Sequence, residues 1–320
     1  MKTKFNKWLR KGTPWIWINA GAVAISIVMV IGLLMLLAVR GINHFWPKDV
    51  LQATYTQPVS GGDPISTQII GEFVESEQIS VGQIVSSGIP VDESQDFYQR
   101  NLIKLGNRDL TGADFSWVLE DYISDVTYPE NVVTLERREW GNFYGFLEEV
   151  RENDQTVAST SAGANFAELW SEFNDRLARA LEIQEQIYDI ENGAIGEINY
   201  QMERLRLEER RLRLEGDIPA EAMGDITAAR EDLDTRYSAL QGELQELYAQ
   251  ANRDSAVFQA ANDQQTVISL ADVVMAYQAN QMHVFAKIGT FFAKLGEFLT
   301  AEPREANTEG GIFPAIFGTV

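Results

Sequence analysis

Residues 15–39 form an unbroken stretch without a charged side chain, and this stretch limits the possible folds more than any other feature. At 25 residues it is long enough to cross the hydrocarbon core of a bilayer as a tilted helix. A cleavable signal peptide would have a shorter apolar region and a small-x-small cleavage site, and residues 36–40 (LLAVR) contain no such site. Trp15, Trp17 and Trp46 flank the stretch, where amphipathic rings favour the membrane interface. We therefore expect an uncleaved transmembrane helix over residues 15–40.

The charges around this helix predict its orientation. Residues 1–14 carry five basic residues and no acidic one, so the positive-inside rule places this tail in the cytoplasm. Six of the 26 Lys and Arg residues lie within residues 1–40, whereas all 47 Asp and Glu residues follow, so residues 41–320 have a formal charge of −27. Such a surface repels nucleic acid and anionic lipid. We expect the central region to be a soluble periplasmic body.

Residues 50–162 predict a β-rich module of short strands separated by turns. The Gly-Gly-Asp-Pro segment at residues 61–64 is a turn signal before a partly alternating apolar run. The last two candidate strands are separated by Gly141-Asn142, which is short enough for a β-hairpin. The candidate strands are residues 65–74, 78–85, 102–105, 115–119, 132–140 and 143–150.

Residues 163–253 change to apolar spacings of three and four, which predict two long helices. Gly216 suits the end of the first helix, and Pro219 is tolerated in the first turn of the second. We expect an antiparallel helical hairpin in which each helix covers the apolar seam of the other. The first helix is the longer one, so we expect its N-terminal part to pack on the β module, with a break or bend near Gly193 and Gly196.

Residues 254–281 return to a strand pattern. Residues 256–260 and 266–270 are apolar or β-branched, and a polar turn separates them. We expect these strands to rejoin the β module, which makes the hairpin an insertion into that module.

The remaining segments again suggest a membrane. Residues 282–300 predict an amphipathic helix, which we expect to lie along the membrane interface, with packing in the protein core as the alternative. After Gly311 comes an apolar segment of nine residues, which as a helix would rise roughly 14 Å at the usual helical rise. That is less than half of a hydrocarbon core of about 30 Å. Residues 307–320 are therefore expected to be the truncated start of a second transmembrane helix.

The fold class predicted from these segments is a membrane-anchored α+β protein. It has one N-terminal transmembrane helix and a β-rich periplasmic module with an inserted antiparallel helical hairpin. An interfacial helix and the start of a second transmembrane helix follow.

Candidate catalytic and ligand-binding residues are few. The chain has no cysteine and only two histidines, His44 and His283, so no histidine-rich metal site can be assembled. Carboxylates are numerous, but no nucleophile elbow, phosphate-binding glycine loop or metal-ligand spacing accompanies them. We predict no catalytic, cofactor-binding or metal-binding residue and no enzymatic activity.

A group of basic residues in the β-rich region allows two interpretations. They could form a positive patch that meets an anion or an acidic partner, or they could lie on solvated strand faces beside buried Trp117, Trp140 and Phe143. The residues are Arg100, Lys104, Arg108, Arg137 and Arg138.

Motifs at both predicted membrane boundaries resemble one transporter family. The chain begins with Thr-Pro-Trp-Ile-Trp at residues 13–17 and Asn-Ala-Gly-Ala at residues 19–22. Arg-Gly-Ile follows the first helix at residues 40–42, and Asn-Thr-Glu-Gly-Gly precedes the second at residues 307–311. Together these motifs resemble the PstA family, the permease subunits of phosphate-specific ABC importers. The resemblance covers about the first 45 and the last 25 residues.

The resemblance implies a subunit of the bacterial inner membrane. Such a subunit pairs with a second permease subunit, is driven by cytoplasmic ATPase subunits and receives phosphate from a periplasmic phosphate-binding protein. The chain departs from smaller family members because about 260 residues separate its two boundary motifs. The residues that line the phosphate pathway are expected beyond Val320, so we transfer no transport residue to this chain.

Two other functions are alternatives to the permease interpretation. A periplasmic membrane-fusion-type adaptor would also have one anchor, a β module and a helical hairpin inserted between strands, but it needs no second membrane helix. A single-pass sensor would need a cytoplasmic signalling domain, and only about 14 residues precede the first helix.

Overall fold

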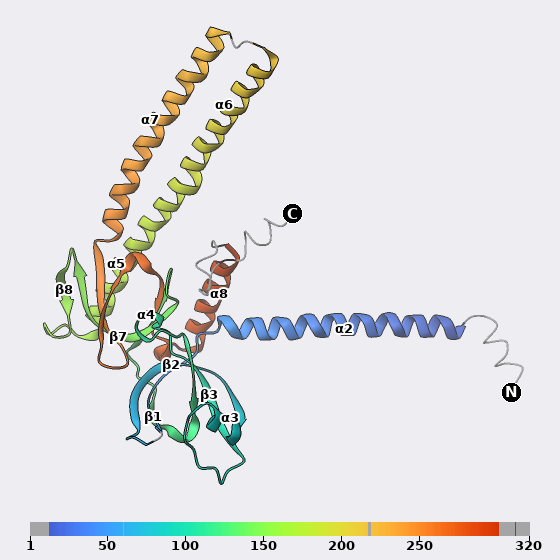
Figure 1. Cartoon of the computed structure of the whole chain (residues 1–320), viewed down its shortest axis with the longest axis vertical. Helices are drawn as coiled ribbons and strands as arrows, with labels where there is room; N and C mark the ends of the chain where they lie inside the picture. Colours follow the sequence, from blue (N-terminus) through green and yellow to red (C-terminus); the bar gives the residue numbers. More distant parts are fainter. Residues whose placement is uncertain (1–12, 60, 217–218, 301–310, 312–320) are drawn as a thin grey trace, which may run out of the picture.

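The computed structural model describes residues 13–59, 61–216, 219–300 and 311. It is an α+β chain with one long N-terminal helix, two antiparallel sheets, a projecting pair of helices and a further helix near the C-terminus (Figure 1). The predicted second membrane helix at residues 307–320 lies outside the described residues, apart from Gly311.

Helix α2 spans Thr13–Phe45 and contains the predicted membrane helix. Within it, Trp15–Gly41 is long and apolar enough to cross a bilayer, and none of its most apolar part is buried inside the protein. Large apolar side chains such as Val28 and Met29, each 69% exposed, would be unfavourable in water. Helix α2 is therefore a candidate membrane span by both composition and exposure.

Sheet A is built from five antiparallel strands in the order β4-β3-β2-β1-β5. Three of the predicted strands fall in β2, β3 and β4, whereas β1 and β5 were not predicted. Side chains from four of its strands form a small core: Leu51, Ala53, Ile69, Ile103 and Val118. The strands are β1 (Val50–Gln57), β2 (Ile65–Ser80), β3 (Phe97–Lys104), β4 (Phe115–Leu119) and β5 (Ile123–Thr127), with short helices α4 (Arg108–Thr111) and η1 (Glu120–Tyr122).

The strand predicted over residues 78–85 is wrong beyond its third residue. Strand β2 ends at Ser80, and Val81–Ser86 forms helix α3. The short helix buries Ile84 against Tyr98 and Leu119. A run this short fits both a helical turn and a strand, so only the tertiary contact decides between them.

Sheet B combines strands from both sides of the helical region, in the order β10-β9-β7-β6-β11, with β8 paired to β7. The central pairing is antiparallel and joins β7 to β9, from Phe146↔Gln259 to Glu152↔Asp254. The predicted β6–β7 hairpin and the predicted return of strands after residue 253 are both present. The strands are β6 (Val132–Arg137), β7 (Asn142–Glu152), β8 (Gln155–Ser159), β9 (Asp254–Gln259), β10 (Gln265–Ser269) and β11 (Val273–Tyr277), with single turns η3 (Leu270–Asp272) and η4 (Ala279–Gln281).

The helical region between β8 and β9 is an antiparallel hairpin, as predicted (Figure 1). Its first arm consists of α5 (Phe166–Tyr188), the π-helical turn η2 (Asp189–Ala194) and α6 (Ile195–Glu215). Its second arm is α7 (Ala220–Ala251). The break expected near Gly193 is a π turn that widens the helix without ending it. Helix α5 packs on sheet B, where Phe173 contacts Phe258 with ring centroids 5.9 Å apart.

Two asparagine side chains join the sheets by mimicking backbone hydrogen-bonding groups. Asn107, in the loop after β3, accepts a hydrogen bond from the Tyr144 N–H at 2.8 Å and donates one to the Tyr144 carbonyl at 2.9 Å. Asn280, in the turn after β11, accepts a hydrogen bond from the Val50 N–H and donates one to the Val50 carbonyl, both at 2.8 Å. It also donates to the Pro129 carbonyl at 2.7 Å. A shared apolar cluster that includes Val50 and Tyr144 lies between the two sheets.

Helix α8 spans Val284–Thr300 and confirms the helix predicted over residues 282–300. It lies beside the C-terminal end of α2, where Phe45 meets Phe291 and Phe298 at ring-centroid distances of 6.4 and 5.1 Å (Figure 1). Helix α8 thus connects sheet B to the end of the apolar helix.

The junction between the sheets predicts a measurable effect of Asn107→Gly. This change removes both hydrogen bonds to Tyr144, and each buried backbone group left unpaired should cost about 1–3 kcal/mol. Glycine tolerates the left-handed backbone of Asn107, whose φ is 51°, so the substitution adds no backbone strain to the folded state. Denaturant unfolding of the full chain in detergent measures the change.

Asn107→Ala is the matched comparison. It loses the same hydrogen bonds and adds the cost of a left-handed alanine, about 1–2 kcal/mol. If Asn107→Gly unfolds at the same denaturant concentration as the unaltered chain, the side chain does not hold the sheets together.

Candidate functional site

The projecting hairpin is the candidate functional site, and its base is fixed to sheet B. Helix α5 begins with a capping box in which the Asn165 side chain accepts from the Glu168 N–H, and the Glu168 carboxylate accepts from the Asn165 N–H. Leu169, Phe173 and Leu177 then lie in the core of sheet B. The first three turns of the arm are therefore part of the body.

A buried ionic cluster reinforces this base. Asp254, at the start of β9, has a side chain only 2% exposed. It accepts hydrogen bonds from Arg176 of α5 at 2.6 Å and from Arg179 one turn later. Arg176 also bonds Glu172 at 2.7 Å and Glu152 of β7 at 2.9 Å. The cluster joins α5 to both central strands of sheet B.

The protonation state of Arg176 is fixed by these partners. Burial lowers the pKa of Arg176, but the hydrogen bonds that Arg176 donates to Glu152, Glu172 and Asp254, together with the charge of Asp254, outweigh the effect of burial. The pKa of Arg176 therefore lies above its ordinary value, and its guanidinium stays protonated at physiological pH.

Beyond the base, hydrogen bonds and a few buried apolar side chains join α6 to α7. Near the body, the Tyr248 hydroxyl of α7 donates to the Glu191 carboxylate at 2.7 Å, which ties α7 to the π turn. Farther out, Glu209 of α6 accepts from Arg230 of α7 at 2.6 Å. Ile198, Ile226 and Leu233 are the buried apolar residues of this outer part. Few buried contacts therefore stabilise the outer arm.

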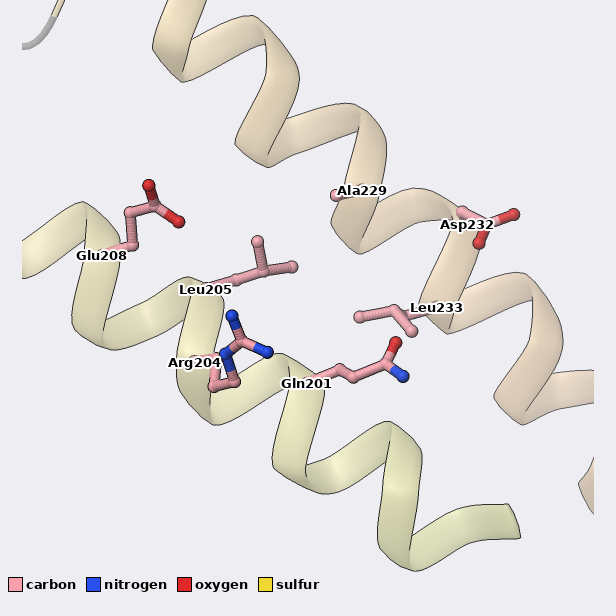
Figure 2. Close-up of a pocket in the computed structure, with 7 residues that line it drawn as sticks. All are labelled: Gln201, Arg204, Leu205, Glu208, Ala229, Asp232 and Leu233. Atoms are coloured by element: carbon pink, nitrogen blue, oxygen red, sulfur yellow. The ribbon is translucent and has the colours of Figure 1, made fainter.

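A groove opens between the two helices in this outer part, with a volume of about 290 Å³. Figure 2 shows Leu205 of α6 and Leu233 of α7 pointing toward each other across it, with Ala229 beside them. Polar side chains surround this apolar floor: Gln201, Arg204, Glu208 and Asp232. An apolar floor with a polar rim is the arrangement that receives a side chain of a protein partner.

Further apolar side chains are exposed along the arm. A second groove of about 340 Å³ lies nearer the base and is lined by residues that include Ile198, Ala239 and Leu240. Tyr200 is 62% exposed, Leu207 52% and Leu214 82%. The outer arm thus offers several apolar contact points separated by charged residues.

The basic residues considered from the sequence do not form a patch, because carboxylates or aromatic rings accompany them. Arg100 donates to Glu77 at 2.7 Å and lies 4.3 Å above the Trp117 ring. A guanidinium nitrogen of Arg108 lies 4.0 Å from a carboxylate oxygen of Asp114. The charge of Lys104 lowers the pKa of Glu72, against the larger opposite effect of burial. Arg100 and Lys104 therefore serve strand pairing in sheet A.

Arg137 and Arg138 are more buried than either sequence interpretation expects. The Arg137 side chain is 5% exposed and pairs with Asp109 at 2.8 Å. Burial lowers the pKa of Arg138, against the charge of Asp272, and its side chain donates to the Ala271 carbonyl at 3.1 Å. Trp140, expected to be buried, is 48% exposed, because it occupies the turn between β6 and β7.

Two other features of the described residues concern ligand binding. Sheet A has a cavity of about 400 Å³ lined mainly by apolar side chains such as Leu51, Ile69 and Tyr128. Within residues 13–59, 61–216, 219–300 and 311, no group of three or more His, Asp or Glu side chains is placed to hold a metal ion. The hairpin, with its fixed base and exposed outer part, is the most developed contact surface in this part of the chain.

Comparison with known proteins gives no relative from which function could be transferred. No protein-family model, curated protein or solved structure matches the chain.

The base of the arm predicts a large effect of Asp254→Asn. The substitution leaves Arg176 buried with less compensating charge, and breaking a buried pair typically costs about 3–5 kcal/mol. Asp232→Asn is the control, because that carboxylate is 71% exposed and 3.9 Å from Arg236, so it should change stability by less than about 0.5 kcal/mol.

Denaturant unfolding of the full chain and amide hydrogen exchange in α5 measure both effects. Equal stability of the two variants would contradict the role of Asp254 as the anchor of the arm.

Proposed function

We propose that this chain is the N-terminal part of a membrane permease subunit of an ATP-driven phosphate importer. Its hairpin is the periplasmic arm that contacts another protein of the transporter. The motifs at residues 13–22, 40–42 and 307–311, which resemble the PstA family, support the transporter assignment. ATP hydrolysis then belongs to a separate subunit, and this chain is not an enzyme.

The docking proposal rests on the direction of the hairpin relative to α2. In Figure 1 the hairpin runs crosswise to α2. With α2 along the bilayer normal, the arm does not reach away from the membrane, and its outer end is inclined toward the side on which α2 extends. An arm in this position is within reach of proteins that sit on or in the same membrane, which include the second permease subunit and a docked phosphate-binding protein.

The charge of the exterior region limits what the arm does. Residues 41–320 have a formal charge of −27, which on average repels phosphate. Concentrating the substrate is therefore a poor role for this region. The apolar grooves between α6 and α7 favour protein contacts instead. The cytoplasmic ATPase subunits lie on the other side of the membrane in this arrangement.

A membrane-fusion-type adaptor is the second candidate. The insertion of the hairpin between β8 and β9, together with one described apolar helix, favours it. An adaptor that bridges the inner membrane to a distant partner needs a hairpin directed away from the membrane, which the crosswise hairpin does not provide.

The proposal places the chain in the bacterial inner membrane with its N-terminus in the cytoplasm and its central region in the periplasm, and this sidedness is directly testable. The chain has no cysteine, so single cysteines report location without background. A membrane-impermeant maleimide should label Ala228→Cys, on the exposed surface of α7, in intact spheroplasts. It should label Thr3→Cys only after the membrane is permeabilised. The reverse pattern would show that the orientation is inverted.

Shortening the arm tests the docking function. Replacing residues 202–237 with a Gly-Ser linker removes the outer groove but keeps the base that packs on sheet B. In cells that depend on this importer, we expect loss of phosphate uptake and of co-purification with the second permease subunit.

The matched control inserts the same linker between Asp217 and Ile218, which changes the tip and removes nothing. Unchanged uptake and assembly in the shortened variant would overturn the docking function. Normal uptake in cells that lack the whole chain would overturn the importer assignment.

A further inference from the structure

Helix α8 exposes an apolar face that contains no charged residue. Phe285 is 80% exposed, Phe292 63%, Leu299 48% and Ile288 37%. Their spacing of three, four and seven residues places them on one side of the helix. The other exposed residues of α8 are Val284, Gly289, Ala293 and Thr300.

The lysines of α8 point the opposite way, into the protein. Lys294 has a side chain 10% exposed, and its Nζ lies 2.5 Å from the Glu136 carboxylate of β6, itself 6% exposed. Lys294 also donates to the Tyr277 hydroxyl at 2.8 Å. Lys287, 13% exposed, pairs with Asp49 at 2.5 Å. These pairs fix the rotation of α8 about its axis.

This arrangement reverses the usual amphipathic pattern. A surface helix in water buries its apolar side and exposes its lysines, because burying a charge costs several kcal/mol that its partner must offset. Here both lysines are paired on the protein side, although Asp49 is itself 59% exposed, while Phe285 and Phe292 lie outside. Phe291 and Phe298 contact Phe45 on the inner side. The reversal is favourable where the helix faces hydrocarbon and not water.

The position of α8 identifies the occupant of this face. Its inner face contacts the end of α2 through Phe45, and Trp46 lies 6.5 Å from Phe291 between ring centroids. Trp favours the boundary between headgroups and hydrocarbon. Helix α8 also runs crosswise to α2 in Figure 1, as a helix in the plane of the membrane does when α2 crosses it.

We infer that α8 is a lipid-binding element. Its Phe285, Ile288, Phe292 and Leu299 face enters the outer leaflet of the membrane that α2 spans. The inference rests on the membrane anchoring within the proposed function. The Lys294–Glu136 and Lys287–Asp49 pairs hold the apolar face toward the lipid and so set the direction of the hairpin relative to the membrane.

Nitroxide depth measurements on the full chain test this inference. Single cysteines at Phe285→Cys and Phe292→Cys carry the label, with the chain placed singly in phosphatidylcholine nanodiscs so that a second copy cannot cover α8. Ile31→Cys, 58% exposed in α2, is the lipid reference, and Ala228→Cys is the water reference. The readout is relaxation by oxygen, which is enriched in lipid, against relaxation by a water-soluble nickel chelate.

We expect both α8 labels to be exposed to lipid, as Ile31→Cys is, but at a shallower depth of about 5–10 Å below the headgroups. Labels that behave like Ala228→Cys would overturn the inference. Labels shielded from both reagents would also overturn it and favour a protein cover. If Ile31→Cys itself behaves as a residue in water, the membrane anchoring fails first, which separates the two outcomes.

Discussion

The pairing of β7 with β9 is the contact on which the shape of this protein depends. It brings residues 142–152 against residues 254–259, so the chain leaves sheet B after β8, on one side of β7, and returns as β9 on the other side. Two long antiparallel helices can make this connection, since each satisfies its own backbone hydrogen bonds and covers the apolar seam of the other. The Asp254 cluster lies where the chain returns, and it joins β7, β9 and α5 at one point.

Charge is used in two opposite ways in this molecule. Over most of residues 41–320 the charge is solvated, and the excess of acidic residues keeps the surface hydrophilic. At the base of the hairpin and beneath α8, ion pairs are instead buried and fix how helices sit on sheet B. A buried pair adds little net stability, but moving either helix would leave a charge without its partner. Such pairs therefore determine orientation more than stability.

Elements with long, regular patterns could be predicted from the sequence. The uncharged run at residues 15–39, the periodic apolar residues of α6 and α7 and the β6–β7 hairpin each carry a local pattern that few other structures satisfy. Short elements could be predicted only in part: β4 and β10 were expected, but others of the same length were not. Strands β5, β8 and β11 are five residues each, and α3 at residues 81–86 was expected to continue a strand. In these segments propensity is weak and neighbouring elements decide.

The sequence by itself determined the membrane-length helix, the acidic excess of residues 41–320 and the presence of a helical hairpin, because each depends on composition or on spacing along the chain. Only the tertiary structure decided that the β-rich region divides between two sheets, that Arg176 and Asp254 pair across the base of the arm and that α8 turns its lysines inward. These features join residues far apart in sequence. Local spacing shows which residues share a helix face, but packing against other elements determines which face is buried.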